Sequence, residues 1–542
     1  MPANKLGCMT LPDTSFRSLP AAAWLLGIFL LLPRWCYGEE SFASTAKEID
    51  RRLAAHWQAK GITPAKRAED AVLLKRVTLD LLGRIPTQAE WEARLKDGKP
   101  LQDRYPQLVV ELLESPEFPL HLGAMLDEML QGSAAGNAEF TDYLRRSVRS
   151  GKPWDVVFRE IMTGPWDTPE RKAAIKFLDV RAKDLDKLTT DTTRVFFGVD
   201  VSCARCHDHP LVDDWKQGHY YGMASFFNRT SGGKGQISEK NEGDVAFKGA
   251  DGSQQTAKVM FLSGSVAVDP PEENGKKPKV SRRQQLVDIA VQDQKFLSRA
   301  LVNRLWQQYF GQGLVHPVDQ IHSGNSPSVP GLLEWLAEDF VASGYNVKRL
   351  VGAIVSSQAY QLSSRWEQSS PPPTEGDFAV MRLRLLSPRQ YAFSVLVATG
   401  KADLAEGTLI EKRAEQLAGT AGSKRIAQYL TIEQQAAELL ANLDPLASGQ
   451  TSAAEALFLS NNPNVQKLFA ADEKSLAAKL SELKQPAEIA VAAIRSVYCR
   501  PSLPDEKDRL TKWIGEQQTP LPQICEQLVW VLVTSAEFRF QH

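Results

Sequence analysis

Hydrophobic residues recur at helical spacing through the first two hundred positions of the chain. Ile49 and Leu53 fall on one face of a segment that ends in a basic residue and a glycine at 60–61, the usual way for a helix to end. The same pattern returns over 71–83, and a Thr-x-x-Glu capping box at 87–90 predicts the start of the next helix. The first part of the chain therefore reads as a set of short packed helices.

The second half of the chain shows the same spacing. Leu297, Leu301 and Leu305 recur every four residues in a segment that ends at Gly311. Asn346 precedes another apolar stretch and is a residue type that caps helix N-termini. This pattern predicts a second helical region that continues to about residue 540.

The segment between these regions has a different texture. It begins with clustered glycines, contains short apolar runs at 259–262 and 266–268, and ends in prolines and lysines. Such a composition predicts a Gly/Pro-rich linker with one or two short β-strands. The sequence thus predicts a mainly α fold, with helical domains at 45–230 and 281–540 joined by a linker at 231–280.

The most apolar run of the chain lies near its start, at 21–32. Lys5 and Arg17 precede it, and Cys36-Tyr37-Gly38 follows it with small residues at the positions that a signal peptidase reads. We expect residues 1–38 to be a signal peptide cleaved after Gly38, with an uncleaved anchor as the alternative. The protein is then exported, periplasmic or extracellular, with no transmembrane anchor after cleavage.

Composition narrows the class of protein. The 542 residues include 64 Lys and Arg against 65 Asp and Glu, and 43% are hydrophobic. An apolar content of this size excludes a wholly disordered chain, and its even spread excludes a polytopic membrane protein. The formal net charge of -1 gives no electrostatic reason to expect nucleic acid as a partner.

Four cysteines remain beyond the leader, which is too few for a disulfide scaffold. Two of them, Cys499 and Cys525, lie in the C-terminal helical region. Because the expected compartment is oxidising, we predict that these two form a disulfide, with two buried thiols as the alternative.

The other two cysteines form the motif Cys203-Ala204-Arg205-Cys206-His207. This spacing lets two thiols add to the vinyl groups of a haem while the histidine binds the iron, so it is typical of c-type haem attachment. Met223 or His219 is a candidate sixth ligand. The motif therefore predicts a haem c cofactor held by Cys203, Cys206 and His207, in a protein that transfers electrons or serves as a redox partner.

Other interpretations of the same segment stay open. The two thiols with two of His207, His209 and His219 have the residue types of a zinc site, and the pair also suits a short-loop disulfide. A protein with such a site would be a non-redox periplasmic or surface protein that binds a partner. The segment 208–219 also has the residue types of a metal-dependent hydrolase. The chain has no Gly-x-Ser-x-Gly, phosphate-loop or His-Glu-x-x-His motif, so the sequence leaves enzymatic activity undecided.

Two long stretches resemble known families. The cysteine motif with the residues around it, together with an upstream Thr-Leu-Asp-Leu-Leu-Gly-Arg-Ile-Pro-Thr motif, is similar to the planctomycete cytochrome C-like domain. Three later motifs resemble the planctomycete secreted domain that commonly follows it. The motifs that carry the resemblance are 199–210, 220–222, 226–227 and 78–87 for the first domain, and 298–306, 310–315 and 356–361 for the second.

The resemblance covers about residues 45 to 540 and implies an exported two-domain protein of unassigned activity. Its expected partner is another exported redox or surface protein. One departure is a stretch of the second domain, at 431–444, where relatives are Cys-rich and this chain has no cysteine. Roles that those cysteines have in relatives are therefore not expected here.

Overall fold

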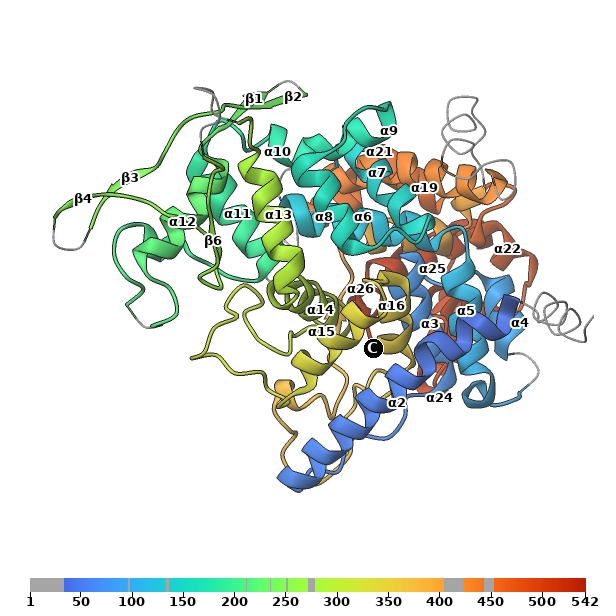
Figure 1. Cartoon of the computed structure of the whole chain (residues 1–542). Coiled ribbons are helices and arrows are strands. Elements are labelled where there is room, and N and C mark those ends of the chain that lie inside the picture. Colours follow the sequence, from blue (N-terminus) through green and yellow to red (C-terminus); the bar gives the residue numbers. More distant parts are fainter. Residues whose placement is uncertain are drawn as a thin grey trace, which may run out of the picture.

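The computed structural model describes residues 34–95, 98–132, 136–210, 212–233, 235–249, 252–271, 278–403, 417, 423–442 and 453–542. Within these residues the protein is mainly helical, as predicted (Figure 1). The apolar run of the expected signal peptide lies outside the described residues, and helix α2 (Arg34–Lys60) passes through the expected cleavage position at Gly38. Among the described helices, none combines the length and the apolar character needed to cross a bilayer.

The N-terminal helices begin and end where the sequence patterns placed them. Gly61 ends α2 and Gly83 ends α3, with φ angles of +65° and +77° that favour glycine. The capping box forms at α4: Thr87 Oγ1 accepts from the Glu90 amide at 3.2 Å, and Glu90 accepts from the Thr87 amide at 2.8 Å. The helices that follow α2 are α3 (Asp70–Leu82), α4 (Gln88–Leu95), α5 (Tyr105–Glu114), α6 (Phe118–Gln131), α7 (Ala138–Arg149), α8 (Trp154–Thr163), α9 (Pro169–Lys172), α10 (Lys176–Asp179), α11 (Leu185–Phe197) and α12 (Gln217–Phe227).

The segment predicted to hold one or two strands contains three antiparallel hairpins, which extend to one side in Figure 1. The pairs are β1 (Thr230–Gly233) with β2 (Gln236–Glu239), β3 (Ala246–Lys248) with β4 (Gln254–Thr256), and β5 (Val259–Met260) with β6 (Val266–Ala267). Only the last pair coincides with the apolar runs noted in the sequence. The other two hairpins consist mostly of polar, exposed residues. Their sequences therefore lack the hydrophobic alternation from which strands are predicted.

The second half is again helical, apart from β7 (Arg384–Leu385) and β8 (Phe540–Gln541), which pair with each other. Asn346 caps its helix as expected, since its Oδ1 accepts from the Arg349 amide at 3.0 Å. The helices are α13 (Arg282–Asp293), α14 (Lys295–Phe310), α15 (Leu332–Ala342), α16 (Val347–Ser356), α17 (Pro388–Thr399), α19 (Ser423–Asn442), α20 (Ala453–Asn461), α21 (Pro463–Phe469), α22 (Leu476–Glu482), α23 (Pro486–Tyr498), α24 (Pro504–Glu516), α25 (Leu521–Thr534) and α26 (Ala536–Arg539).

Two hydrophobic clusters form the interior, and they divide the chain at a different place from the expected linker. The first cluster runs from Phe42 to Met381 and so includes residues on both sides of 231–280. The second runs from Leu386 to Phe538 and adds three residues of the N-terminal region, Leu79, Ile85 and Leu120. Helix α3 therefore contributes to both clusters, and the N-terminal region packs against the C-terminal one.

The predicted disulfide between Cys499 and Cys525 is not formed. Both are free thiols buried in the second cluster. The Cys499 sulfur faces the main-chain oxygen of Pro86, 3.8 Å away, on the segment between α3 and α4. Apolar packing therefore accounts for these two cysteines, as for most buried free thiols.

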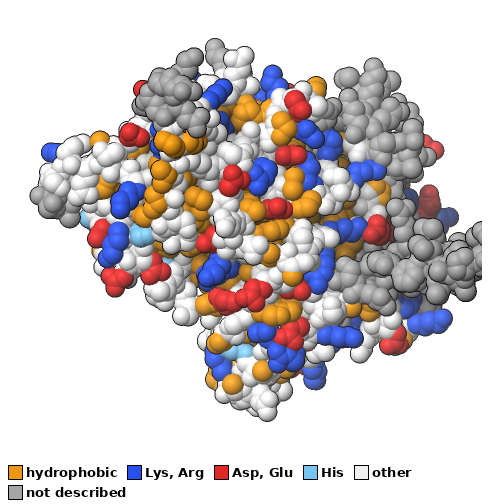
Figure 2. All heavy atoms as spheres, viewed as in Figure 1, with side chains coloured by type: hydrophobic (Ala, Val, Ile, Leu, Met, Phe, Trp, Pro, Cys, Tyr) orange, Lys and Arg blue, Asp and Glu red, His pale blue; other side chains and the backbone are white. Residues whose placement is uncertain are grey.

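Charges of both signs are mixed over the surface. On the face shown in Figure 2, Lys and Arg side chains are interspersed with Asp and Glu side chains. This mixture agrees with the near balance of charge in the sequence. The visible face therefore shows no single-sign surface of the kind that nucleic acid binds.

Candidate functional site

The Cys203–His207 motif forms a short exposed turn after α11. Gly198 ends that helix with a φ of +68°, and residues 202–205 then form a single 3-10 turn. Ala204, inside the motif, is fully buried in the first cluster. Cys203, Cys206 and His207 are exposed, so the turn holds its backbone against the core while it presents the two thiols and the imidazole to solvent.

Side chains of α12 hold the turn in place. Gln217 Nε2 donates to the main-chain oxygen of Cys206 at 2.9 Å, and the Tyr221 hydroxyl donates to that of Arg205 at 2.9 Å. Asp208 accepts from the Gln217 amide at 2.9 Å. Three bonds thus connect Arg205, Cys206 and Asp208 to α12, which fixes the backbone that carries the thiols.

The turn is also tied to the second half of the chain. The Asp200 amide donates to the main-chain oxygen of Asp319 at 2.8 Å, next to an isolated bridge between Val199 and Gln320. The Asp200 carboxylate bonds Arg194 at 2.6 Å and the Ser202 amide at 2.9 Å. Burial opposes ionisation of this carboxyl, but these bonds hold the pKa of Asp200 below its usual range.

The structure does not bring the candidate zinc ligands together. Among the described residues, no group of three or more Cys, His, Asp or Glu side chains is placed to hold a metal ion. His219 Nδ1 accepts from the Lys216 amide at 3.1 Å and so closes the first turn of α12. Burial lowers the pKa of His219, an effect that Asp208 and Asp214 oppose. The role of His219 in the structure is therefore to cap the N-terminus of α12.

The other candidate sixth ligand, Met223, is fully buried. It belongs to the first hydrophobic cluster, with 0% of its surface exposed, whereas the two thiols of the motif are exposed. The structure thus assigns Met223 to packing inside α12. No signal in the sequence separated a core methionine from a ligand methionine at this position.

An aromatic pair lies beside the motif. The rings of Tyr221 and Phe247 stack with centroids 4.2 Å apart and planes at 15°, and both residues are half-buried. Burial raises the pKa of Tyr221, and the nearby Cys206 adds to this rise while Arg205 opposes it. The exposed thiol of Cys206 therefore has an aromatic neighbour that comes from α12 and a hairpin strand.

His322 is a residue of this region that the sequence predicts to be a loop or capping histidine and not a ligand. It lies in a loop of the second half, next to Ser323, whose amide donates to Asp214 at 2.8 Å across 109 positions of sequence. Burial lowers the pKa of His322, Asp214 opposes that shift and His209 adds to it. The fold thus places His209, Asp214 and His322 within electrostatic range, a grouping that only the tertiary structure could reveal.

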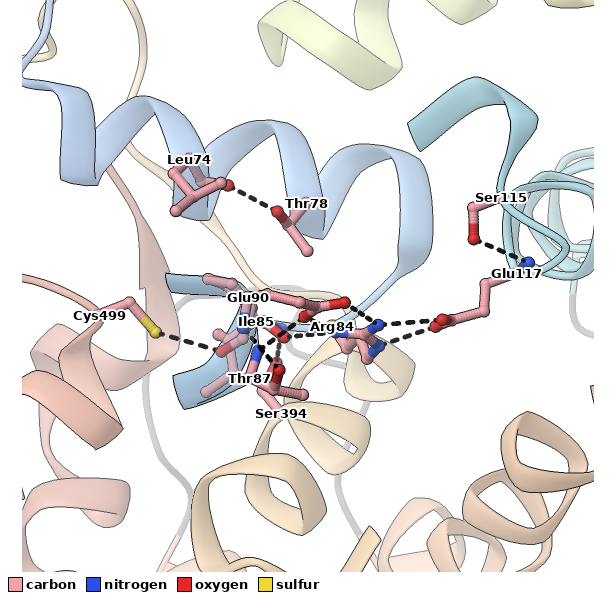
Figure 3. Close-up of polar contacts among 11 residues, drawn as sticks. Leu74, Thr78, Arg84, Ile85, Thr87, Glu90, Ser115, Glu117, Ser394 and Cys499 are labelled. Atoms are coloured by element: carbon pink, nitrogen blue, oxygen red, sulfur yellow. Dashed lines mark hydrogen bonds and ion pairs between the residues drawn. The ribbon is translucent and has the colours of Figure 1, made fainter. Parts of the chain in front are cut away.

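The residues of the motif at 78–87 are mostly buried and make contacts inside the protein. At its centre Arg84 lies between Glu90 and Glu117, as Figure 3 shows. Its guanidinium bonds Glu117 at 2.8 and 3.0 Å and Glu90 at 2.8 and 2.9 Å. Burial opposes ionisation, yet the bonds from Arg84 lower the pKa of Glu90 to about 2. We call Arg84, Glu90 and Glu117 the Arg84 cluster.

Helix α3 connects the two regions that carry the family resemblance. Asp80, in the first motif, accepts from the Tyr360 hydroxyl at 2.6 Å and from Arg384 at 2.7 Å. Tyr360 lies in the motif at 356–361, and its main-chain oxygen accepts from Arg76 at 2.5 Å. These buried contacts give the two motifs a shared role in joining α3 to the second half of the chain.

Comparison with known families finds two matches in tandem. Residues 48–232 match the family described as PSCyt2, protein of unknown function (DUF1549). Residues 282–514 match the family described as PSD1, protein of unknown function (DUF1553). The two matches lie in tandem, on either side of most of the segment predicted as a linker. No curated protein and no solved structure shows a significant match.

Proposed function

We propose that the protein is an exported electron-transfer protein or redox partner with a c-type haem attached through Cys203 and Cys206, and with His207 as the axial ligand. The observation that carries this proposal is the motif turn itself, which presents two thiols and an imidazole to solvent from a fixed backbone. Haem attachment needs only these three groups in sequence, whereas zinc needs three or four side chains that converge on one point.

The residues of the turn fit the chemistry of attachment. Both thiols are free and exposed, and the stacked Tyr221 and Phe247 rings offer an apolar surface beside Cys206. His207 Nδ1 lies 2.7 Å from the main-chain oxygen of Asp208, so it carries the proton and leaves Nε2 as the nitrogen with a lone pair. A haem held there supplies a one-electron redox centre.

The proposal includes no sixth ligand from the protein. Met223 is fully buried, and His219 uses Nδ1 to cap α12. The resemblance to planctomycete cytochrome C-like and secreted domains favours the same proposal. The apolar run at 21–32 also favours it, because haem is attached to such a motif in the exported compartment. Its partner would be another exported redox or surface protein.

A second candidate is a metal site near the turn, in a non-redox protein that binds a partner. The grouping of His209, Asp214 and His322 favours it, because these side chains have the donor types of a zinc centre. Closing such a site requires the side chains to move closer together than they are in the structure.

Expression with a working haem-attachment system separates the candidates. Covalent haem should remain on the denatured parent protein, fall to a single thioether in Cys203→Ala, and vanish in Cys203→Ala with Cys206→Ala. His207→Ala should keep covalent haem and change its spin state and absorption spectrum. Cys525→Ala is the matched control, since it removes a thiol outside the motif and should leave the haem unchanged.

His209→Ala tests the second candidate. Haem attachment should tolerate this change, while a zinc site should lose its one bound metal. A parent protein that carries no haem but one zinc ion, lost in His209→Ala, would replace the first proposal with the second. A parent protein with neither would reject both.

A further inference from the structure

A cavity of about 650 Å³ lies between α3 and the last helices of the chain. The strand-like segment before α3 and the loop after Leu362 close one side, and α23 with the loop at 499–503 closes the other. We call it the α3 cavity. It shares no residue with the Cys203–His207 turn, so it is a separate site on the molecule.

The inner wall of the α3 cavity carries two nearly buried cations, Lys75 and Arg76. Lys75 is 5% exposed and makes no hydrogen bond or ion pair with any described residue. Arg76 is 0% exposed and uses Nε and Nη1 on the main-chain oxygens of His542, Tyr360 and Leu362, while its Nη2 finds no partner among the described residues. A buried donor that stays unpaired is costly, and Arg76 Nη2 is such a donor. Lys75, next to it in the sequence, is a nearly buried cation that lines the cavity without an acceptor among the described residues.

The carboxylates around the cavity are already occupied, with one exception. Arg500 bonds Glu506 at 2.7 and 2.8 Å and Glu537 at 2.6 and 2.8 Å. Glu367 lies 3.4 Å from Lys66 at the exposed rim. The remaining one, Glu69, is exposed at the start of α3.

Two further cations enlarge the excess of positive charge. Arg67 uses its other nitrogens on Asp70 and Gln361, but its buried Nη2 finds no partner among the described residues. Arg365 lies at the cavity edge, and its charge acts on the imidazole of His542. The lining of the α3 cavity thus has six Lys and Arg side chains against four Glu side chains, while Asp70 next to the cavity neutralises Arg67.

Lys75 shows the effect of this environment. Burial lowers the pKa of its ammonium group, an effect that Arg500 strengthens and that Cys499 and Glu537 oppose. An anion in the cavity would restore the charged form, because an opposite charge offsets the loss of solvation. Lys75 therefore lowers the free energy of unfolding of the ligand-free protein. A bound anion would offset this loss by pairing with its charge.

We propose that the α3 cavity binds a small organic molecule through a carboxylate, sulfate or phosphate group, which accepts a hydrogen bond from Lys75 Nζ. The volume lies in the range of small-molecule sites. Small side chains along the α3 side, Ala65, Ala68 and Ala71, leave room for the uncharged part of the ligand. Charge-assisted bonds of this kind are the stronger ones in proteins.

Isothermal titration of the full mature chain with inorganic phosphate, sulfate and citrate tests the site, and the three probes distinguish the three oxyanion classes. At least one probe should bind with one equivalent per chain. Lys75→Met should weaken it about tenfold or more, as expected for loss of a bond to a charged group. Lys75→Arg should keep most of the affinity, because it keeps the cation.

The matched control is Lys512→Met, which removes the same charge from an exposed position on α24 outside the cavity. It should bind the probe as the parent does. Absence of binding by all three probes would overturn the proposal. So would equal affinity of the parent and Lys75→Met, or an equal loss in the control, since either result would place binding elsewhere on the surface.

Discussion

The Cys203–His207 turn and the α3 region use polar side chains in opposite ways. The turn buries its apolar residues and presents two thiols and an imidazole to solvent. Helix α3 instead buries charged side chains, among them Lys75, Arg76 and Asp80. One region thus holds reactive groups on the outside, and the other holds charges inside.

The two regions differ in whether their chemical groups can be identified from the sequence or only from the structure. The groups of the turn lie within five consecutive residues, so spacing alone revealed them. The charges of α3 meet partners from distant segments, such as Tyr360 and Arg384 for Asp80. The four predictions that follow test this contrast between exposed and buried groups.

The largest expected effect concerns the reactivity of the thiols. In reduced protein without haem, iodoacetamide should modify Cys203 and Cys206 about 1,000-fold faster than Cys499, because burial raises the pKa of Cys499 to about 12 and the thiolate is the reactive form. Burial also raises the pKa of Cys525, to about 11. Mass mapping over time measures the rates. All four should react alike in urea, and equal rates in the folded protein would contradict the contrast.

The Arg84 cluster should show the largest effect on stability. Arg84→Met should lower the free energy of unfolding by about 3–5 kcal/mol, because it leaves Glu117, only 8% exposed, without its partner. Urea denaturation measures the change. Arg84→Met combined with Glu117→Leu should recover part of the loss, since it removes the buried Glu117 carboxylate and leaves only the half-buried Glu90 without its cation. A loss below about 1 kcal/mol in the single variant would show that Glu117 reaches water.

Lys75→Met should have the opposite sign and raise the stability of the ligand-free protein by about 1 kcal/mol at pH 7. The folded pKa of Lys75 lies below its ordinary value of 10.5. The unfolded chain therefore binds more protons between those two values, and the parent gains stability as the pH rises through that window.

The advantage of Lys75→Met over the parent should accordingly shrink between pH 7 and pH 10. Urea denaturation at both pH values checks this, with Lys512→Met as the control that should show no such trend. An advantage that grows with pH would mean that the Lys75 ammonium is stabilised in the fold.

The smallest effect is expected at the turn. Cys203→Ser and Cys206→Ser should each change the free energy of unfolding by less than about 0.5 kcal/mol in protein without haem, because both side chains are exposed. Thermal unfolding measures it, with Ala204→Asp as the disruptive comparison, since it places a charge at a fully buried position of the same turn. A loss above about 2 kcal/mol for either serine variant would indicate a structural pair.

Much of the fold followed from local sequence signals. Helix ends at Gly61 and Gly83 and the cap at Asn346 depend on residues a few positions apart, so the sequence predicted them. The hairpin at 246–256 escaped prediction because its residues are mostly polar and exposed. Nothing in the local pattern distinguishes such a strand from a loop.

The candidate sites divide in the same way. The motif identified Cys203, Cys206 and His207 as candidate site residues, yet it did not predict that Met223 packs in the core or that His322 comes near His209. The disulfide prediction at Cys499 was wrong because compartment and position in the chain say nothing of which neighbour a thiol faces. Long-range contacts decided each of these outcomes.

The way α3 is enclosed also sets an order of events during synthesis. Gln541 donates to the main-chain oxygen of Arg76 at 3.0 Å, across 465 positions of sequence. At about 5–20 residues per second, a ribosome needs roughly 25 to 90 seconds to make the residues that separate Arg76 from Gln541. Leu79 of α3 belongs to the second cluster, which extends to Phe538, so α3 is fully enclosed only when the C-terminal region has been made.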